Sequence, residues 1–169
     1  MSDTETASLL RDIRILVVDD EPDLRMGLTR LLRSAGAAVS DAASAEEARA
    51  HLENATADIV LSDIRMTGMT GVELLRFVRT QFPATEVALM TAYGSIELAV
   101  ECLQAGAAHF ITKPFDNDDL LTTLARIGKA IVAGRSGGGR DGRMVGRGEQ
   151  RHPERNDCLL YTSDAADEE

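Results

Sequence analysis

The chain has 169 residues, of which 44 % are hydrophobic, so it is long enough for one domain with a sizeable core and some tail. Its formal net charge of -10 argues against nonspecific binding to DNA or to an anionic membrane surface. No apolar run of bilayer length and no signal segment occurs, which argues against a membrane protein. Cys102 and Cys158 lie in unrelated contexts, which argues against a disulfide scaffold or a zinc site. These features predict a cytoplasmic protein.

Short apolar runs alternate along the chain with segments that have the period of an amphipathic helix. In chain order, the expected strands span residues 13–18, 38–42, 59–62, 86–90 and 108–112. The expected helices that follow each of them span residues 22–36, 44–54, 70–82, 95–106 and 116–134. This alternation predicts an α/β fold with a doubly wound, five-stranded parallel sheet.

Local signals mark the ends of several of these helices. The first carries its leucines on one stripe and should stop at Gly36. Ser44 and Glu47 have the spacing of a capping box at the start of the second. The last helix begins with acidic residues, which suit the positive end of the helix dipole.

The composition changes at Gly134. The stretch GRSGGGRDGRMVGRGEQRHPERND is rich in glycine and arginine and has no apolar period, so it cannot bury enough surface to fold. We therefore expect an N-terminal extension over residues 1–12, the folded domain over residues 13–133 and a disordered linker or tail over residues 134–169.

Charged and polar side chains follow four of the expected strands. Asp19 and Asp20 end the first strand, Asp63 the third, Thr91 the fourth and Lys113 the fifth. Doubly wound sheets bind ligands at the carboxyl ends of their strands, so adjacent strands would gather these groups in one crevice. Clustered carboxylates are tolerated around Mg²⁺, and an ammonium and a hydroxyl suit phosphoryl oxygens. The alternative is that the first two acids only cap the next helix, but capping needs one acid and the third strand repeats the chemistry.

At these positions the chain resembles the response-regulator receiver domain of two-component signalling. The matching motifs are VVDDE, LSDIRM, GMTGVELL, LMTAYG and AGAAHFITKPF. Their order and approximate spacing match from Ile13 to about Val132. The resemblance implies a flavodoxin-like fold with strand order 2-1-3-4-5.

The resemblance also implies a role for each matching residue near the acids. Asp63 would be the phospho-acceptor. Asp20 would bind Mg²⁺ directly, together with Asp63 and the backbone carbonyl of Arg65, and Asp19 would hold a metal-bound water.

Further roles follow from the same resemblance. Lys113, which precedes a cis bond to Pro114, would contact the phosphoryl group, and Thr91 would close on it. Phe110 would change rotamer together with Thr91. The face formed by the fourth helix, fifth strand and fifth helix would then change shape, and a second copy of the chain could dock there as a homodimer.

The implied function is a signalling switch and not an enzyme that turns over a substrate. A sensor histidine kinase would phosphorylate Asp63, the domain would slowly hydrolyse its own acyl phosphate, and the output would be transcription. We expect this fragment to contact neither nucleic acid nor membrane directly. The alternative is a Mg²⁺-dependent phosphatase with an aspartyl nucleophile, but such proteins carry a second aspartate where this chain has Glu21.

The chain departs from the family's pattern at one position beside the acceptor. Thr67 follows the residues DIRM, where the family usually has proline, so the loop after Asp63 is expected to be less rigid. This affects the expected rate of dephosphorylation more than the role of Asp63.

The stretch MTAYGSIELAVECLQAGAAHFITKPFD is most similar to receivers of the NtrC type, which usually precede an ATPase domain that drives sigma-54-dependent transcription. DGRMVGRG resembles the opening of that ATPase domain, and CLLYTSDAADEE resembles a translated sequencing adapter. We therefore expect a truncated reading frame with an artefactual C-terminal tail. The alternative is a stand-alone receiver with a disordered tail.

Overall fold

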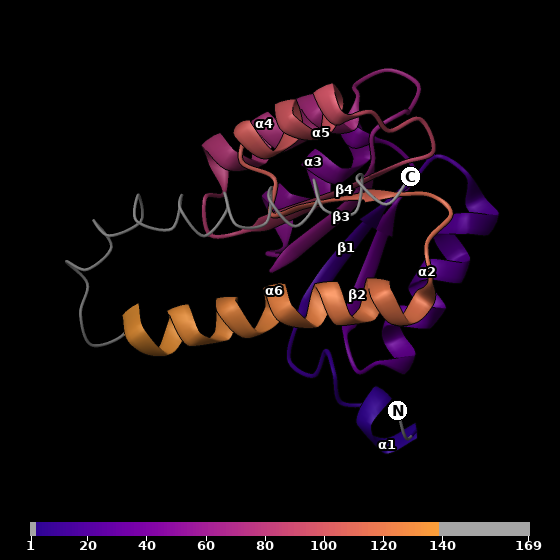
Figure 1. Cartoon of the computed structure of the whole chain (residues 1–169). Helices are drawn as coiled ribbons and strands as arrows, with labels where there is room; N and C mark the ends of the chain where they lie inside the picture. Colours follow the sequence, from indigo (N-terminus) through magenta and orange to yellow (C-terminus); the bar gives the residue numbers. More distant parts are fainter. Residues whose placement is uncertain (1–2, 139–169) are drawn as a thin grey trace.

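The computed structural model describes residues 3–138, and in this range strands and helices alternate as predicted (Figure 1). In chain order the elements are α1 (Asp3–Thr6), β1 (Arg14–Val18), α2 (Pro22–Ser34), β2 (Ala38–Ala42), α3 (Ala45–Asn54), β3 (Ile59–Asp63), α4 (Gly71–Gln81), β4 (Glu86–Thr91), α5 (Ile96–Gln104), β5 (His109–Thr112) and α6 (Asn117–Gly138). Every expected strand and helix is present within a few residues of its expected bounds. The short helix α1 is an addition, so the fourth and fifth helices of the sequence prediction are α5 and α6.

The strands form one sheet in the order β2-β1-β3-β4-β5, and all neighbouring strands are parallel. The predicted flavodoxin-like fold is therefore confirmed. The chain leaves β1 for the edge strand β2 and then returns to the other side of β1. The carboxyl ends of β1 and β3 lie at this reversal, which is where doubly wound sheets bind ligands.

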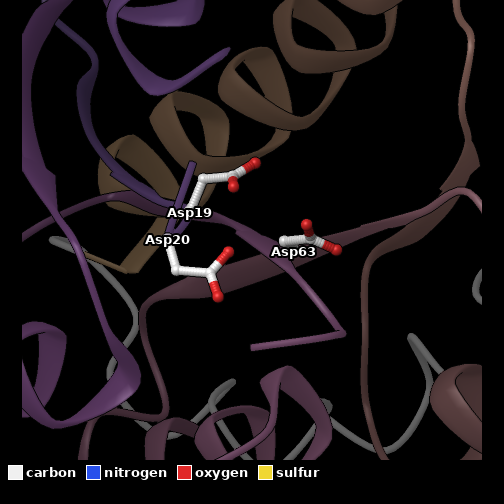
Figure 2. A group of neighbouring side chains, drawn as sticks. All are labelled: Asp19, Asp20 and Asp63. Carbon is white, nitrogen blue, oxygen red and sulfur yellow. The ribbon is translucent and has the colours of Figure 1, made fainter. Parts of the chain in front are cut away.

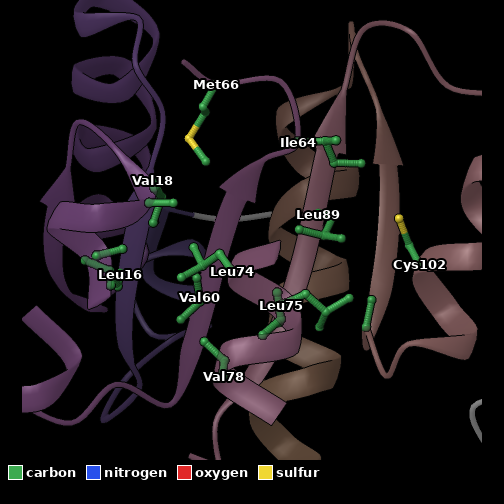
Figure 3. Close-up of a cluster of buried hydrophobic side chains, with 14 of the residues drawn as sticks. Leu16, Val18, Val60, Ile64, Met66, Leu74, Leu75, Val78, Leu89 and Cys102 are labelled. Atoms are coloured by element: carbon green, nitrogen blue, oxygen red, sulfur yellow. The ribbon is translucent and has the colours of Figure 1, made fainter. Parts of the chain in front are cut away.

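Helices cover both faces of the sheet, with α3, α4 and α5 on one face and α2 and α6 on the other (Figure 1). Because side chains alternate along a strand, each inner strand supplies both cores. The core beneath α3, α4 and α5 includes Leu16, Val18, Val60, Leu74, Leu75 and Leu89 (Figure 3). The core beneath α2 and α6 includes Ile15, Val17, Ile59, Leu61, Leu121 and Leu124.

Helix capping follows the sequence signals with one shift. The Ser44 hydroxyl accepts the N–H of Glu47 at 3.0 Å, as a capping box requires. The Glu47 carboxylate, however, accepts the N–H of Ala43 and not that of Ser44. The complete capping box is at the start of α4, where Thr70 and Glu73 bond reciprocally.

Part of the predicted N-terminal extension belongs to the core. Leu10 is fully buried, and its N–H donates to the carbonyl of Ala35 at 2.8 Å. Gly36 has a φ of 100°, and a Cβ there would lie 2.7 Å from the carbonyl oxygen of Ala7. Glycine is therefore what lets the N-terminal segment lie against the end of α2.

The C-terminal boundary also differs from the prediction. Helix α6 continues through Gly134, where the linker was expected to begin, and ends at Gly138. Ile131 packs against the core, and Arg135 forms an ion pair with Asp58, so the helix retains partners beyond the predicted boundary. Residues 139–169, which make up most of the predicted tail, lie outside the described residues. From residue 3 to residue 138, no helix combines the length and apolar character needed to cross a bilayer.

Asp58 is a buried carboxylate at the amino-terminal edge of the sheet. Its Oδ2 accepts the N–H of Arg14 at 2.8 Å and the Nε of Arg14 at 3.1 Å. Its Oδ1 accepts Nη2 of Arg14 at 2.8 Å and is also bonded by Arg135. Burial raises the pKa of Asp58, but the hydrogen bonds from Arg14 and Arg135 outweigh it and lower the pKa to about 2.

Asp58→Asn should lower the free energy of unfolding at neutral pH by roughly 1–3 kcal/mol, because the arginines lose their charged partner. The pKa in the folded protein is about 2, below the ordinary value of 3.8. The stabilisation should therefore be fully present above the ordinary pKa and be lost as the pH falls toward the folded one. Chemical denaturation of both proteins over this pH range should show their difference shrinking.

A suitable control is Glu53→Gln, which alters an exposed glutamate near the end of α3. It should change the free energy of unfolding by less than about 0.5 kcal/mol. A difference between wild type and Asp58→Asn that stays constant as the pH falls would contradict the ionised pair.

Candidate functional site

The predicted site residues gather at the carboxyl edge of the sheet. Asp19 and Asp20 directly follow β1, and Asp63 is the last residue of β3, the strand beside β1. Thr91 ends β4, and Lys113 follows β5. Since these strands are parallel and adjacent in the order β1-β3-β4-β5, the residues at their carboxyl ends lie together at one edge of the sheet.

The three aspartates form a compact cluster (Figure 2). Each offers a carboxylate oxygen, and these oxygens all lie within 4.8 Å of one another. Asp19 is only 1 % exposed, Asp63 is half-buried and Asp20 is exposed, so the cluster runs from the interior to the surface. An open group of hard oxygen ligands fits the coordination that Mg²⁺ prefers in proteins, with positions left for water and phosphoryl oxygens. The donor set therefore fits a magnesium ion.

Lys113 places one positive charge between two of the acids. Its Nζ lies 3.1 Å from Oδ2 of Asp63 and 3.4 Å from Oδ2 of Asp19. The peptide bond from Lys113 to Pro114 is cis, as predicted. One ammonium cannot neutralise three carboxylates, so the cluster keeps excess negative charge that a divalent cation would offset.

Asp19 is held by groups from several elements. Its Oδ1 accepts the N–H of Glu21 at 2.9 Å, and Nη1 of Arg25 donates to its backbone carbonyl at 2.7 Å. Burial raises the pKa of Asp19, and the Glu21 N–H and the charge of Lys113 oppose that increase. Arg25 also pairs with Asp41 at 2.8 Å and was not among the residues predicted from the sequence. The one sequence feature that could have indicated Arg25 is its position, one helical turn after Glu21.

The two predicted switch residues lie on neighbouring strands. Thr91 is 1 % exposed, and its hydroxyl accepts the N–H of Tyr93 at 3.1 Å. Phe110 is buried in the core beneath α3, α4 and α5. A Cβ on Gly94 would lie 3.3 Å from the Phe110 ring, so the β4–α5 loop rests directly on that ring. The same short loop therefore contacts both Thr91 and Phe110.

The loop after Asp63 is linked to the β4–α5 loop through Arg65. The N–H of Arg65 donates to Oδ1 of Asp63 at 3.3 Å. Its guanidinium lies over the exposed ring of Tyr93, 4.4 Å from the ring centroid. The backbone of Arg65 thus lies beside the aspartate cluster, which is compatible with the predicted use of its carbonyl.

A protein-family model described as the response regulator receiver domain matches residues 15–125. The chain is 43 % identical over 112 residues to the C4-dicarboxylate transport transcriptional regulatory protein DctD of Rhizobium meliloti, covering 66 % of this chain and 24 % of that protein. It is 38 % identical over 112 residues to the DNA-binding transcriptional regulator NtrC of Salmonella typhimurium, covering the same shares. The chain therefore spans about a quarter of the length of these curated relatives.

Solved structures show the same similarity. A CheY-like receiver domain protein from Methanospirillum hungatei has a TM-score of 0.69 at 33 % identity, covering 72 % of this chain and 97 % of that one. NtrX from Brucella abortus has a TM-score of 0.69 at 32 % identity, covering 73 % of this chain and 28 % of that one. The likeness thus extends to nearly the whole of one receiver domain protein and to about a quarter of a longer chain.

Asp20→Asn should raise the free energy of unfolding in metal-free buffer by about 0.5–1 kcal/mol, because it removes one of three mutually repelling carboxylates. Mg²⁺ should raise the melting temperature of the wild type and have a much smaller effect on this variant. Differential scanning calorimetry with EDTA and with Mg²⁺ measures both effects.

The matched control is Asp23→Asn, an exposed carboxylate in the first turn of α2 that is not part of the cluster. It should keep the wild-type response to Mg²⁺. If Asp20→Asn also kept that response, Asp20 would not be a metal ligand.

Proposed function

This chain belongs to the response regulator receiver domain family, and on that premise we propose that Asp63 accepts a phosphoryl group from a sensor histidine kinase in a Mg²⁺-dependent reaction. The observation that carries the proposal is the position of Lys113, whose Nζ lies within 3.4 Å of both Asp19 and Asp63 beside a third carboxylate. A paired ammonium next to excess carboxylate charge suits both a divalent cation and a phosphoryl group.

Asp63 is the best-placed nucleophile of the three acids. Asp19 is buried and already accepts the Glu21 N–H, whereas Asp63 is half-buried and partly open to solvent. A carboxylate oxygen of Asp63 would attack the phosphorus of a phosphohistidine, the phosphorus–nitrogen bond would break, and the leaving imidazole would take up a proton. The product is an acyl phosphate on Asp63.

The neighbouring residues would bind and orient the reacting groups. Asp20, Asp63 and the backbone carbonyl of Arg65 would hold Mg²⁺, and Asp19 would hold a water bound to it. The chemistry supplied by a bound Mg²⁺ is neutralisation of charge on the carboxylates and on the transferred phosphoryl oxygens. Lys113 would exchange its contact with Asp63 for one with a phosphoryl oxygen. Water that reaches the phosphorylated Asp63 would slowly hydrolyse the acyl phosphate.

Thr91 and Phe110 would convert phosphorylation into a change of surface. The Thr91 hydroxyl would leave the Tyr93 N–H and donate to a phosphoryl oxygen, which draws the β4–α5 loop inward. Because that loop rests on Phe110, the ring would turn into the vacated space. The phosphoryl group would bias these two arrangements through its differential contacts.

The output would be read at the α5–β5–α6 face, by a partner or by a second copy in a homodimer. We propose transcription as the controlled process, because the relatives DctD and NtrC are named as transcriptional regulators. The domain would act in the cytoplasm as a signalling switch, without binding nucleic acid itself. Membership in the receiver family disfavours the Mg²⁺-dependent phosphatase that was the alternative.

Asp63→Asn should abolish labelling by acetyl phosphate with Mg²⁺, because the amide keeps the shape of the side chain and lacks the nucleophilic oxygen. Intact-protein mass spectrometry should show one added phosphoryl group on the wild type and none on the variant. Asp23→Asn should be labelled like the wild type. Labelling of Asp63→Asn at the wild-type rate would assign the acceptor to another residue.

Thr91→Ala should leave phosphorylation of Asp63 largely intact while uncoupling it from α5 and Phe110, because the hydroxyl that links them is lost. Backbone amide shifts measured with and without beryllofluoride should move across α5 in the wild type and far less in the variant.

Thr80→Ala removes an exposed hydroxyl that donates to the Arg76 carbonyl within α4 and should respond like the wild type. Equal shifts across α5 in Thr91→Ala and the wild type would exclude the Thr91 hydroxyl as the link.

A further inference from the structure

The loop between β3 and α4, residues 64–70, carries the Arg65 carbonyl and has Thr67 where proline is usual in the family. Its two ends are fixed by the backbone. The N–H of Ile64 donates to Met90 at 2.8 Å, and the N–H of Gly71 donates to Ile64 at 2.9 Å. A Cβ on Gly71 would lie 2.4 Å from the Asp63 carbonyl oxygen, so α4 begins directly against the proposed acceptor.

Between these ends, backbone N–H groups of the loop donate to carboxylates. The pairs are Arg65 with Asp63 at 3.3 Å, Thr67 with Asp20 at 3.4 Å, Met69 with Glu46 at 3.1 Å and Thr70 with Glu73 at 2.8 Å. The first two carboxylates belong to the aspartate cluster, so their contacts depend on what the cluster binds. Glu46 and Glu73 lie outside the cluster, so their hydrogen bonds to the loop do not depend on what the cluster binds. Proline at position 67 would have no N–H to donate to Asp20.

Glu46 differs from Glu73 because it reaches the loop from another element. Glu73 caps the start of its own helix α4, whereas Glu46 lies in the first turn of α3. Gly68, at the apex of the loop, has a φ of 83°, and a Cβ there would lie 2.9 Å from Oε2 of Glu46. The Glu46 carboxylate therefore packs against Gly68, where a side chain would not fit, and accepts the N–H of the next residue, Met69. Hydrogen bonds from its own N–H and from that of Met69 lower the pKa of Glu46, so it stays ionised at neutral pH.

We propose that Glu46 is a positioning residue for the metal site: by holding Gly68 and Met69, it keeps the β3–α4 loop, and with it the Arg65 carbonyl, in place beside Asp63 and Asp20. The inference rests on the proposed function, because it concerns the same Mg²⁺ site. A proline at position 67 would stiffen the loop from within. In this chain, the hydrogen bond to Glu46 of α3 would restrain the loop from outside. Glu46 itself touches neither the metal nor the phosphoryl group.

The test compares Glu46→Ala, which removes both charge and acceptor, with Glu46→Gln, which removes the charge and keeps an acceptor oxygen. Glu46→Ala should weaken Mg²⁺ binding roughly threefold to tenfold, the effect of about one hydrogen bond. It should also accelerate hydrogen exchange of the Met69 amide in metal-free buffer. Glu46→Gln should lie near the wild type in both measurements. Isothermal titration with MgCl₂ and exchange followed by nuclear magnetic resonance provide the two readouts.

Glu53→Gln removes an exposed charge from the same helix and should change neither readout. Glu46→Ala and Glu46→Gln could instead weaken Mg²⁺ binding equally and leave Met69 exchange unchanged. That result would show that Glu46 acts on Mg²⁺ only through its charge, and it would overturn the inference. So would wild-type affinity in Glu46→Ala. Absence of Mg²⁺ binding by the wild type would instead overturn the proposed function, and with it the role of Glu46 toward the metal.

Discussion

Mutual repulsion among the carboxylates of Asp19, Asp20 and Asp63 is the constraint around which the carboxyl edge of the sheet is organised. Their oxygens lie within 4.8 Å of one another, and one ammonium, that of Lys113, lies among them. The other hydrogen bonds that these aspartates accept offset part of that charge. Arg25 donates to the Asp19 carbonyl, and backbone N–H groups of the loops donate to the carboxylates. The negative charge that remains is what a divalent cation could neutralise.

A second buried aspartate, at the opposite edge, shows how environment decides the chemistry of a carboxylate. Asp58 receives hydrogen bonds from Arg14 and Arg135 and has a pKa lowered to about 2. Its charge is fully compensated, so it stabilises the fold and leaves nothing for a ligand. The aspartates at the other edge share one lysine and remain available. The sheet thus has one edge where the buried carboxylate is paired and one edge where the carboxylates outnumber their cation, and α6 is tied to the first edge through Arg135.

The loops above the site connect these local charges to the surface. Arg65 stacks on Tyr93, the Tyr93 N–H bonds Thr91, and Gly94 rests on Phe110, so the β3–α4 and β4–α5 loops contact the same few side chains. Gly71 and Gly94 permit this closeness because a Cβ at either position would meet a neighbouring atom at 3.3 Å or less. A group that draws Thr91 inward would therefore act on packed neighbours, which transmit displacement because they cannot be compressed.

The sequence by itself was sufficient for the fold class and the members of the aspartate cluster, because each depends on local pattern or on a residue at a strand end. The strand order was expected from the resemblance of these motifs to the receiver family, since local pattern does not specify it. Apolar runs such as residues 13–18 mark strands, and a parallel sheet brings their carboxyl ends together whatever the details of packing. Ser44 could likewise be identified as a cap from the four residues around it. The partner of Glu47, which proved to be Ala43, depends on backbone geometry that spacing does not specify.

Contacts between residues distant in the chain were decided only by the tertiary structure. Leu10 enters the core because Gly36 leaves room for the N-terminal segment, and α6 passes Gly134 because Arg135 meets Asp58. Glu46 meets Met69 across 23 residues of sequence, and neither residue belongs to a motif that would pair them. Composition and period describe a segment by itself, whereas these contacts depend on which segments the folded sheet brings side by side.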